Sequence, residues 1–197
     1  MGGQRNEEME NVLLASIKAR NEGLTLIPPV TVLTSNASSI DIDLRGVQDD
    51  MFHHFYLCGI LRTTATATAD TILITVNNDT GPNYHYARWV FSDATTSAIA
   101  RANINYMGII QCDAGSSTPN AYSSFTMDVP VFAHDYKKLS FFATSMRIGT
   151  TASNTQIAGI QGMGCWTGTV AIEQLTFRPN SGSNFVAGCR IYTYGIK

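Results

Sequence analysis

The residues of this chain that could bind a metal ion include four histidines. His53 and His54 are adjacent, and because neighbouring residues of a strand point to opposite faces, the two cannot share one ion. His85 and His134 have no potential ligand at a spacing known from zinc sites. We therefore expect these histidines to lie at the solvent or at an interface, without a metal.

Four aspartates could supply the oxygen ligands that Ca²⁺ prefers. Asp41 and Asp43 alternate with apolar residues along a predicted strand and share one face, and Asp49 and Asp50 follow shortly after. Alternating apolar and acidic residues are also typical of a strand with one buried and one solvated face. We expect this second arrangement, and therefore no bound metal and no cofactor.

The tripeptide Asp79-Thr80-Gly81 matches the active-site tripeptide of aspartic proteases. Those enzymes need two such carboxylates that share a proton, and they carry each aspartate just after a buried apolar strand. Here Asn77 and Asn78 precede the aspartate, and Pro82 follows the glycine. Because asparagine, aspartate, glycine and proline dominate turns, the pattern predicts a turn over residues 77–83.

Other catalytic patterns are weak or missing in the sequence. The glycines of residues 159–164 lack the following helix that a dinucleotide-binding fingerprint requires. Residues 157–166 predict instead a strand with bulges or a close approach of the backbone. There is no Gly-x-Ser-x-Gly motif, no Cys/His dyad with a recognisable local context and no paired glutamates on neighbouring strands. We therefore predict that the protein is not an enzyme and has no catalytic residues.

The four cysteines, Cys58, Cys112, Cys165 and Cys189, are widely spaced and form no Cys-x-x-Cys motif. Three of them lie within apolar runs, where cysteine commonly acts as a small buried apolar residue. We expect buried, reduced thiols. A disulfide such as Cys165–Cys189 is the alternative.

Several aromatic residues alternate along the chain and could stack on a sugar ring. Alternating aromatic residues pack more often in a core or an interface, and this is what we expect. The residues concerned are Trp89, Trp166, Tyr84, Tyr86, Tyr192 and Tyr194.

The composition limits which elements can position these residues. A chain of 197 residues is most simply one domain, and at this size it buries roughly 70% of its unfolded surface without a disulfide or a metal. Charged residues make up 14%, against about 25% in typical globular proteins, which suits β-sheets and large interfaces. The net charge is −2 and no basic run is longer than Lys137-Lys138, so we expect no binding to nucleic acid.

The sequence shows no targeting or spanning segment. Its first residues contain no apolar signal-peptide core, and no apolar run reaches the roughly 18 residues that span a membrane. We therefore expect synthesis in a cytoplasm and no association with a membrane.

Residues 1–23 differ from the rest and predict an N-terminal helical arm. Glutamates crowd the start of this segment and Lys18 and Arg20 its end, as the helix dipole favours, and Gly23 is a suitable stop signal. About fifteen residues are marginal for an isolated helix, so the arm must dock on its own sheet or on a neighbouring subunit or larger scaffold. The apolar stripe of the arm, our candidate interface, consists of Met9, Val12, Leu13 and Ile17.

Residues 24–197 predict one all-β domain of about ten strands with short turns, typical of a sandwich or a barrel. Pro28-Pro29 interrupts the first strand, which must therefore be an edge strand or a connecting arm. Residues 92–103 are ambiguous between a loop and a short helix. A final pair of strands, residues 170–177 and 185–196, flanks a turn, and a chain that ends on a strand needs that strand paired.

Three stretches of the chain resemble virion structural proteins of tailed bacteriophages, specifically the jelly-roll decoration or cement proteins that cover capsids. The first stretch, Ile74 to Tyr84, has Asn, Asp, Gly, Asn and Tyr at similar spacing. The second, Val131 to Leu139, has a Tyr-Lys pair before a new strand. The third, Trp166 to Ile196, has an Ala-Ile-x-x-Leu strand, a Ser-Gly-x-Asn-Phe turn and an aromatic-Gly-Ile ending. Similar proteins usually have Ser where this chain has Cys189, and they end in Leu-Tyr-Gly-Ile, where this chain has Thr-Tyr-Gly-Ile.

The resemblance covers roughly residues 39–197 and implies an antiparallel jelly roll, or β-sandwich, of about eight to ten strands behind the helical arm. It further implies a homotrimer on the outer capsid surface of the virion, where it binds the major capsid protein near threefold positions and stabilises contacts between capsomers. One alternative is a tail-fibre or receptor-binding module that binds carbohydrate, with Trp89 or the Tyr84–Tyr86 region as its platform. A hydrolase of the host envelope is a third possibility, for which we find no carboxylate pair or triad.

Overall fold

A computed structural model of the chain describes residues 24–45, 52, 54–92, 95–117, 119–130, 139–151 and 154–196. In these ranges the secondary structure consists of twelve β-strands. In chain order the strands are β1 (Leu24–Val32), β2 (Ile40–Asp43), β3 (His54–Leu61), β4 (Ala69–Val76), β5 (Tyr84–Ser92), β6 (Thr96–Ile104), β7 (Met107–Asp113), β8 (Ser123–Pro130), β9 (Leu139–Thr151), β10 (Asn154–Trp166), β11 (Gln174–Pro179) and β12 (Arg190–Ile196).

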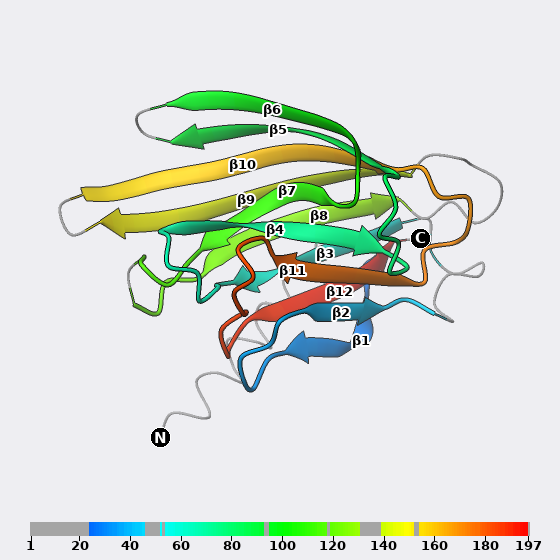
Figure 1. The fold of residues 1–197 in the computed structure, drawn as a ribbon. Helices are drawn as coiled ribbons and strands as arrows, with labels where there is room; N and C mark the ends of the chain where they lie inside the picture. The colour runs from blue at the N-terminus through cyan, green and yellow to red at the C-terminus, as the bar shows by residue number, and fades with distance from the viewer. Residues whose placement is uncertain are drawn as a thin grey trace, which may run out of the picture.

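The strands form two sheets that pack against one another (Figure 1). The larger sheet has eight strands in the order β1-β12-β3-β8-β9-β10-β5-β6, and the smaller has four in the order β2-β11-β4-β7. Neighbouring strands are antiparallel in both sheets. The prediction of an all-β antiparallel domain is confirmed, with twelve strands in place of about ten.

The core lies between the two sheets because alternate residues of each strand point inward. In β2, Ile40 and Ile42 are only 2% and 6% exposed, whereas Asp41 and Asp43 are exposed, as the alternation predicts. Residues such as Leu57 of β3 are fully buried in the same core. Complete burial of a side chain of this size contributes about 1.5–3 kcal/mol relative to exposure.

The predictions for the first and last strands, both in the larger sheet, are confirmed. β12 pairs with β1 on one side and with β3 on the other, so the C-terminal strand is held within the sheet. β1 lies at the sheet edge, and its register with β12 shifts between Ile27 and Thr31, across Pro28 and Pro29. Proline has no N–H to donate to a neighbouring strand, which confines it to such a position.

The glycines of β10 allow the two sheets to approach closely. A Cβ on Gly162 would lie 2.9 Å from Cβ of Ile109, and one on Gly164 would lie 2.5 Å from the sulfur of Met107. Both contacts are with β7 of the smaller sheet. The predicted close approach is therefore confirmed. The predicted bulges are not found, because β10 pairs with β5 and β9 without a shift of register.

One expectation about the strands was wrong, and one arrangement was not foreseen. The segment 92–103, which was ambiguous between a loop and a helix, contains most of β6, which pairs with β5. Local propensity could not show this, because an edge strand of small and polar residues has little apolar alternation. The last two strands, β11 and β12, do not form a hairpin but belong to different sheets.

Two hairpins extend one side of the larger sheet. β9–β10 and β5–β6 are hairpins of neighbouring strands, and together they form the β9-β10-β5-β6 half of that sheet (Figure 1). Of the other eight strands, four belong to the larger sheet (β1, β3, β8 and β12) and four to the smaller sheet (β2, β4, β7 and β11). The smaller sheet covers the larger one mainly through β7, which contacts β9 and β10.

The predicted arm falls outside the described residues. Its proposed helix and the candidate interface residues Met9, Val12, Leu13 and Ile17 lie within residues 1–23. Within the described ranges, no helix has the length and apolar character needed to cross a membrane.

Candidate functional site

The Asp79-Thr80-Gly81 tripeptide lies in the turn between β4 and β5, as predicted. One carboxylate oxygen of Asp79 accepts the backbone N–H of Gly81 at 2.8 Å. The other accepts the side-chain amide of Asn83 at 2.8 Å and the indole N–H of Trp166 at 2.7 Å. These bonds, that from Trp166 above all, hold the pKa of Asp79 below its usual value. The carboxylate is therefore a structural acceptor whose environment favours the charged form.

Two of the possible sugar-stacking aromatics are buried beside this turn. The Tyr84 ring is fully buried, and its hydroxyl accepts the Val76 N–H and donates to the Asp79 carbonyl, both at 2.9 Å. Trp166 is 2% exposed. Burial raises the pKa of Tyr84 to about 12. Tyr86, at 9% exposure, is also part of the core, so none of these three rings is a surface platform.

The candidate metal ligands do not meet in the described part of the chain, where no group of three or more His, Cys, Asp or Glu side chains could hold an ion. Asp41 accepts the Thr176 hydroxyl at 2.6 Å. Both oxygens of Asp43 accept hydrogen bonds from Arg45, at 2.7–3.0 Å. The Arg45 guanidinium lowers the pKa of Asp43 to about 2. Asp49, Asp50, His53 and His134 lie outside the described residues.

The cysteines are all thiols, so the Cys165–Cys189 disulfide is not formed. Cys112 and Cys189 are buried, at 1% and 0% exposure, and Cys58 and Cys165 are partly buried. Burial raises the pKa of Cys58, Cys112 and Cys189, which favours the neutral thiol over the nucleophilic thiolate.

A buried aspartate gathers hydroxyl groups at one edge of the sandwich. Asp70, 5% exposed, accepts hydrogen bonds at a single oxygen from Ser181 at 2.8 Å and from Ser183 and Thr63 at 3.2 Å. Because all three hydroxyls donate to the same carboxylate oxygen, the cluster fixes the turn after β11 against the start of β4. Its role is to anchor the loop.

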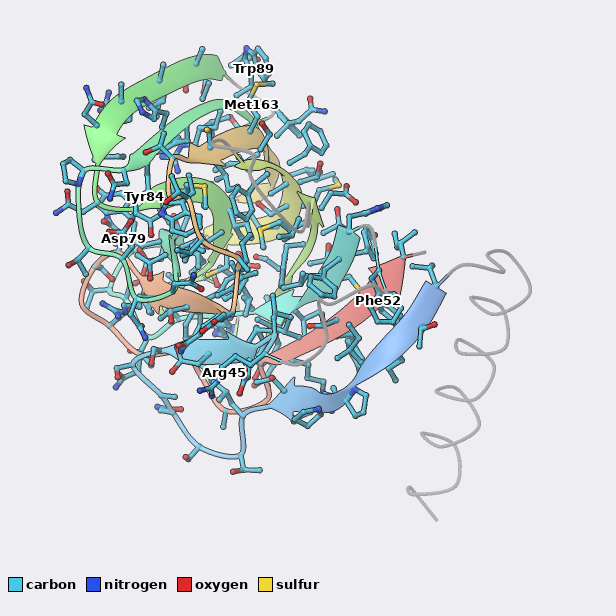
Figure 2. All side chains as sticks on the ribbon, turned by 90° about the vertical axis from the view of Figure 1, so that its right-hand side faces the viewer. Arg45, Phe52, Asp79, Tyr84, Trp89 and Met163 are labelled. Atoms are coloured by element: carbon cyan, nitrogen blue, oxygen red, sulfur yellow. The ribbon has the colours of Figure 1, made fainter. Side chains whose placement is uncertain are left out.

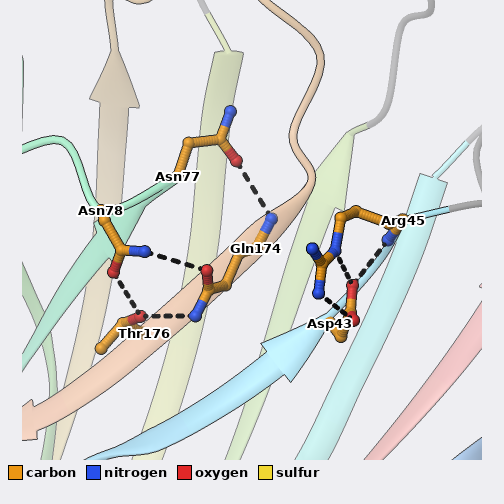
Figure 3. Close-up of polar contacts among 6 residues, drawn as sticks. All are labelled: Asp43, Arg45, Asn77, Asn78, Gln174 and Thr176. Atoms are coloured by element: carbon orange, nitrogen blue, oxygen red, sulfur yellow. Dashed lines mark hydrogen bonds and ion pairs between the residues drawn. The ribbon is translucent and has the colours of Figure 1, made fainter.

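A shallow polar pocket of about 160 Å³ lies at the end of the smaller sheet, lined by Arg45, Asn77, Asn78, Glu173 and Gln174. Figure 3 shows that its amide groups bond to one another. Asn77 accepts two backbone N–H groups at 2.7 and 3.0 Å and donates to the Ala171 carbonyl at 2.7 Å. Asn78 donates to Gln174 at 3.0 Å. The pocket is smaller than the roughly 300–1,000 Å³ typical of ligand sites, and these amides hold loops together.

A larger feature is a set of six exposed side chains on the outer side of the eight-stranded sheet, which we call the apolar face. They come from β5, β9 and β10, and each is 37–51% exposed. Of the eight large apolar side chains that are exposed in the described residues, only Val32 and Val170 lie elsewhere. Figure 2 shows Trp89 and Met163 together at one end of the molecule, away from Arg45. The members of the apolar face are Trp89, Phe91, Phe142, Met146, Ile157 and Met163.

Strand pairing brings the members of the apolar face together. Phe142 of β9 is directly opposite Met163 of β10, and Met146 is opposite Gly159. On its other side, Gly159 is opposite Phe91 of β5. A Cβ on Gly159 would lie only 2.6 Å from the Phe91 ring, so the glycine provides the space in which the ring lies across β10.

The size of the apolar face can be estimated from the exposed fractions of its side chains. Six side chains of this kind, each 37–51% exposed, present on the order of 500 Å². The largest apolar patch on a monomeric protein is typically about 300–600 Å² and is often functional. The apolar face is therefore the strongest candidate functional site in the described part of the chain.

Only part of this surface could be expected from the sequence. Trp89 was named there as a residue that could stack on a sugar, but nothing connected it with β9 and β10. No local signal makes that connection, because the register that aligns the strands joins residues about 70 positions apart. No family model, curated protein or solved structure matches the chain.

Proposed function

We propose that this chain is a structural protein of a tailed-bacteriophage virion, of the capsid decoration or cement type. It binds the outer capsid surface as a homotrimer and stabilises contacts between neighbouring capsomers. The resemblance of its sequence to such proteins suggests the role, and the apolar face is the observation that carries it.

The strand order supports the finer proposal that the domain is a jelly roll. When the hairpins β5–β6 and β9–β10 are set aside, eight strands remain in the orders β1-β12-β3-β8 and β2-β11-β4-β7. The first of these strands pairs with the last, the second with the seventh, the third with the sixth and the fourth with the fifth. This nested pairing is that of one long hairpin rolled into two sheets. Jelly rolls of this kind recur in viral capsid and lectin domains.

The two additional hairpins supply the surface for the proposed role. All six members of the apolar face lie on β5, β9 and β10, the strands that lie outside the eight nested ones. An uncharged surface of this kind binds by excluding water, with modest energy per copy. Repetition of the contact by symmetry then multiplies weak contacts into stable attachment, which is what a clamp between capsomers needs.

Capsid binding can be tested by co-sedimentation of the purified chain with phage particles that lack it. We expect W89S/M163S, which removes two of the six side chains of the apolar face, to weaken binding at least about tenfold, which corresponds to roughly 1.4 kcal/mol. V170S is the matched control, because Val170 is 63% exposed but does not belong to the apolar face. Unchanged binding by W89S/M163S would reject the apolar face as the contact surface.

The predicted arm has its own test. Deletion of residues 1–23 should abolish binding to the capsid and leave a folded trimer, because Met9, Val12, Leu13 and Ile17 are our candidate anchor. Light scattering reports the copy number, and electron microscopy of particles with and without the chain reports its location. Retained binding after the deletion would reject the anchor.

A carbohydrate-binding tail or receptor module is the second candidate, and one observation favours it. Trp89 exposes 46% of its surface beside Phe91, and such a ring can stack on a sugar. The Tyr84–Tyr86 region, which was the other platform considered for this alternative, cannot serve as one because both rings belong to the core. A glycan array with the wild type and W89S distinguishes the two functions: binding to a glycan that W89S abolishes would favour this candidate.

A further inference from the structure

β6 is an unusually open edge strand. Within the described ranges it is the last strand of the larger sheet, and its one partner there is β5. Seven of its nine residues are exposed, so both of its faces as well as its free edge meet solvent. In an antiparallel ladder, about half of the N–H and C=O groups of an edge strand point away from its one neighbour. Such an edge is a template for another strand.

The other strand edges carry features that oppose pairing. β1, at the opposite edge of the same sheet, contains Pro28 and Pro29, which have no N–H to donate. On β7, the N–H groups of Gln111 and Asp113 already donate to the hydroxyls of Ser145 and Ser123. β2 has only four residues, two of them exposed aspartates. β6 has no proline and a single charged residue, Arg101, and the shift in its register with β5 lies beyond that residue, so residues 96–101 lack the usual protection.

We propose that β6 pairs with β6 of a second copy of this chain, antiparallel and about a twofold axis. Two identical edges related in this way are self-complementary, because each supplies the donors and acceptors that the other lacks. The inference goes beyond the proposed function and depends neither on the trimer nor on the binding of a capsid.

The residues of β6 indicate the register. Its ladder with β5 is regular from Thr96 to Arg101, and Asn103 has a φ of 53°, which ends the extended edge. The extended part before Asn103 therefore spans residues 96–102, and its midpoint is Ile99. With Ile99 on the axis, Arg101 lies opposite Ser97 of the second copy and not opposite a second arginine. Like charges in directly opposite positions would be destabilising.

The pairing has a consequence for the apolar face. β6 adjoins β5, so joining two β6 edges makes one continuous sheet with both apolar faces on strands of that sheet. A partner would then contact two apolar faces, each with an exposed area on the order of 500 Å². Two linked contacts bind far more tightly than one.

Charged residues introduced on both sides of the twofold axis test the pairing. Ala98 and Ala100 are exposed and would lie opposite one another in the two copies. A98K/A100K places lysines opposite lysines and should lower the mass measured by light scattering twofold. A98K/A100E places lysines opposite glutamates and should restore the mass of the wild type. Thermal unfolding of each variant reports whether the fold is intact.

The outcomes separate this inference from the proposed function. A twofold loss of mass in A98K/A100K with recovery in A98K/A100E supports the pairing, whether the masses correspond to six and three chains or to two and one. Equal masses for all three proteins, or an equal loss in both variants, would overturn it. Co-sedimentation of the same proteins with phage particles tests capsid binding independently. If the wild type pairs through β6 but does not sediment with the particles, only the proposed function is rejected.

Discussion

The indole N–H of Trp166 donates a 2.7 Å hydrogen bond to the carboxylate of Asp79, two residues that are 87 positions apart. Asp79 belongs to the turn between β4 and β5, and Trp166 ends β10. The bond therefore links two additional hairpins. It joins the connection before β5–β6 to the end of β9–β10. A tripeptide that matches a protease motif is thus a structural joint.

Replacement of Asp79 by asparagine should destabilise the fold by about 1–3 kcal/mol at neutral pH, because the amide N–H₂ would face a donor in either orientation, the Gly81 N–H in one and those of Asn83 and Trp166 in the other. The folded pKa of Asp79 is lowered from 3.8, so its stabilising effect is complete above that value and is lost as the pH falls through the lowered pKa. The difference in unfolding free energy between the wild type and D79N, measured with urea, should therefore become smaller at acid pH. D43N is the control, because the Asp43–Arg45 pair is exposed and should matter little. A constant difference at all pH values would contradict the assignment.

Alkaline pH should act through Tyr84. Its pKa is raised from 10.0 to about 12 in the folded protein. The contribution of Tyr84 to the free energy of unfolding is therefore fully present below pH 10 and is lost as the pH rises from there through about 12. Y84F removes the acceptor of the buried Val76 N–H and should cost about 1–3 kcal/mol near neutral pH. The unfolding free energy of Y84F should also fall less steeply than that of the wild type in the alkaline range. Equal slopes for the two proteins would show that Tyr84 is not the titrating group.

The contact between Gly159 and Phe91 should appear as a coupling energy. G159A places a Cβ within 2.6 Å of the Phe91 ring and 3.0 Å of the Ser145 carbonyl oxygen, and such overpacking costs about 1–3 kcal/mol. In F91A/G159A the ring is absent, so the combined loss of unfolding free energy should be smaller than the sum of the two single losses. A double-mutant cycle from urea unfolding measures this difference. Strict additivity would mean that the ring does not lie over the glycine.

Cysteine labelling should follow burial. In the native protein at neutral pH, iodoacetamide should leave Cys112 and Cys189 unmodified, because both are buried and their thiol pKa values are raised. In denaturant without reductant, all four cysteines should react, and mass spectrometry counts the added groups. Two unreactive cysteines in denaturant would reveal a disulfide, and rapid native labelling of Cys112 would contradict its burial.

Individual strands could be predicted where the pattern is local. Ile40, Ile42 and Leu44 are buried between exposed aspartates, as the alternation predicts, and the turn at residues 77–83 follows from its composition. β6 could not be predicted, because an edge strand exposed on both faces has no buried side to impose a period. The separation of β11 and β12 into different sheets also left no local mark.

The sequence by itself determined that the described domain is all β and which residues of a strand share a face, because both follow from side-chain alternation. It also determined that the first strand is an edge, because proline has no N–H to donate. Tertiary structure alone decided which face of β5 is buried. Tyr84 and Tyr86 on one face and Trp89 and Phe91 on the other are all aromatic, so apolar character could not distinguish them. The smaller sheet covers only one side of β5, and that contact buries the tyrosines and leaves Trp89 and Phe91 to the apolar face.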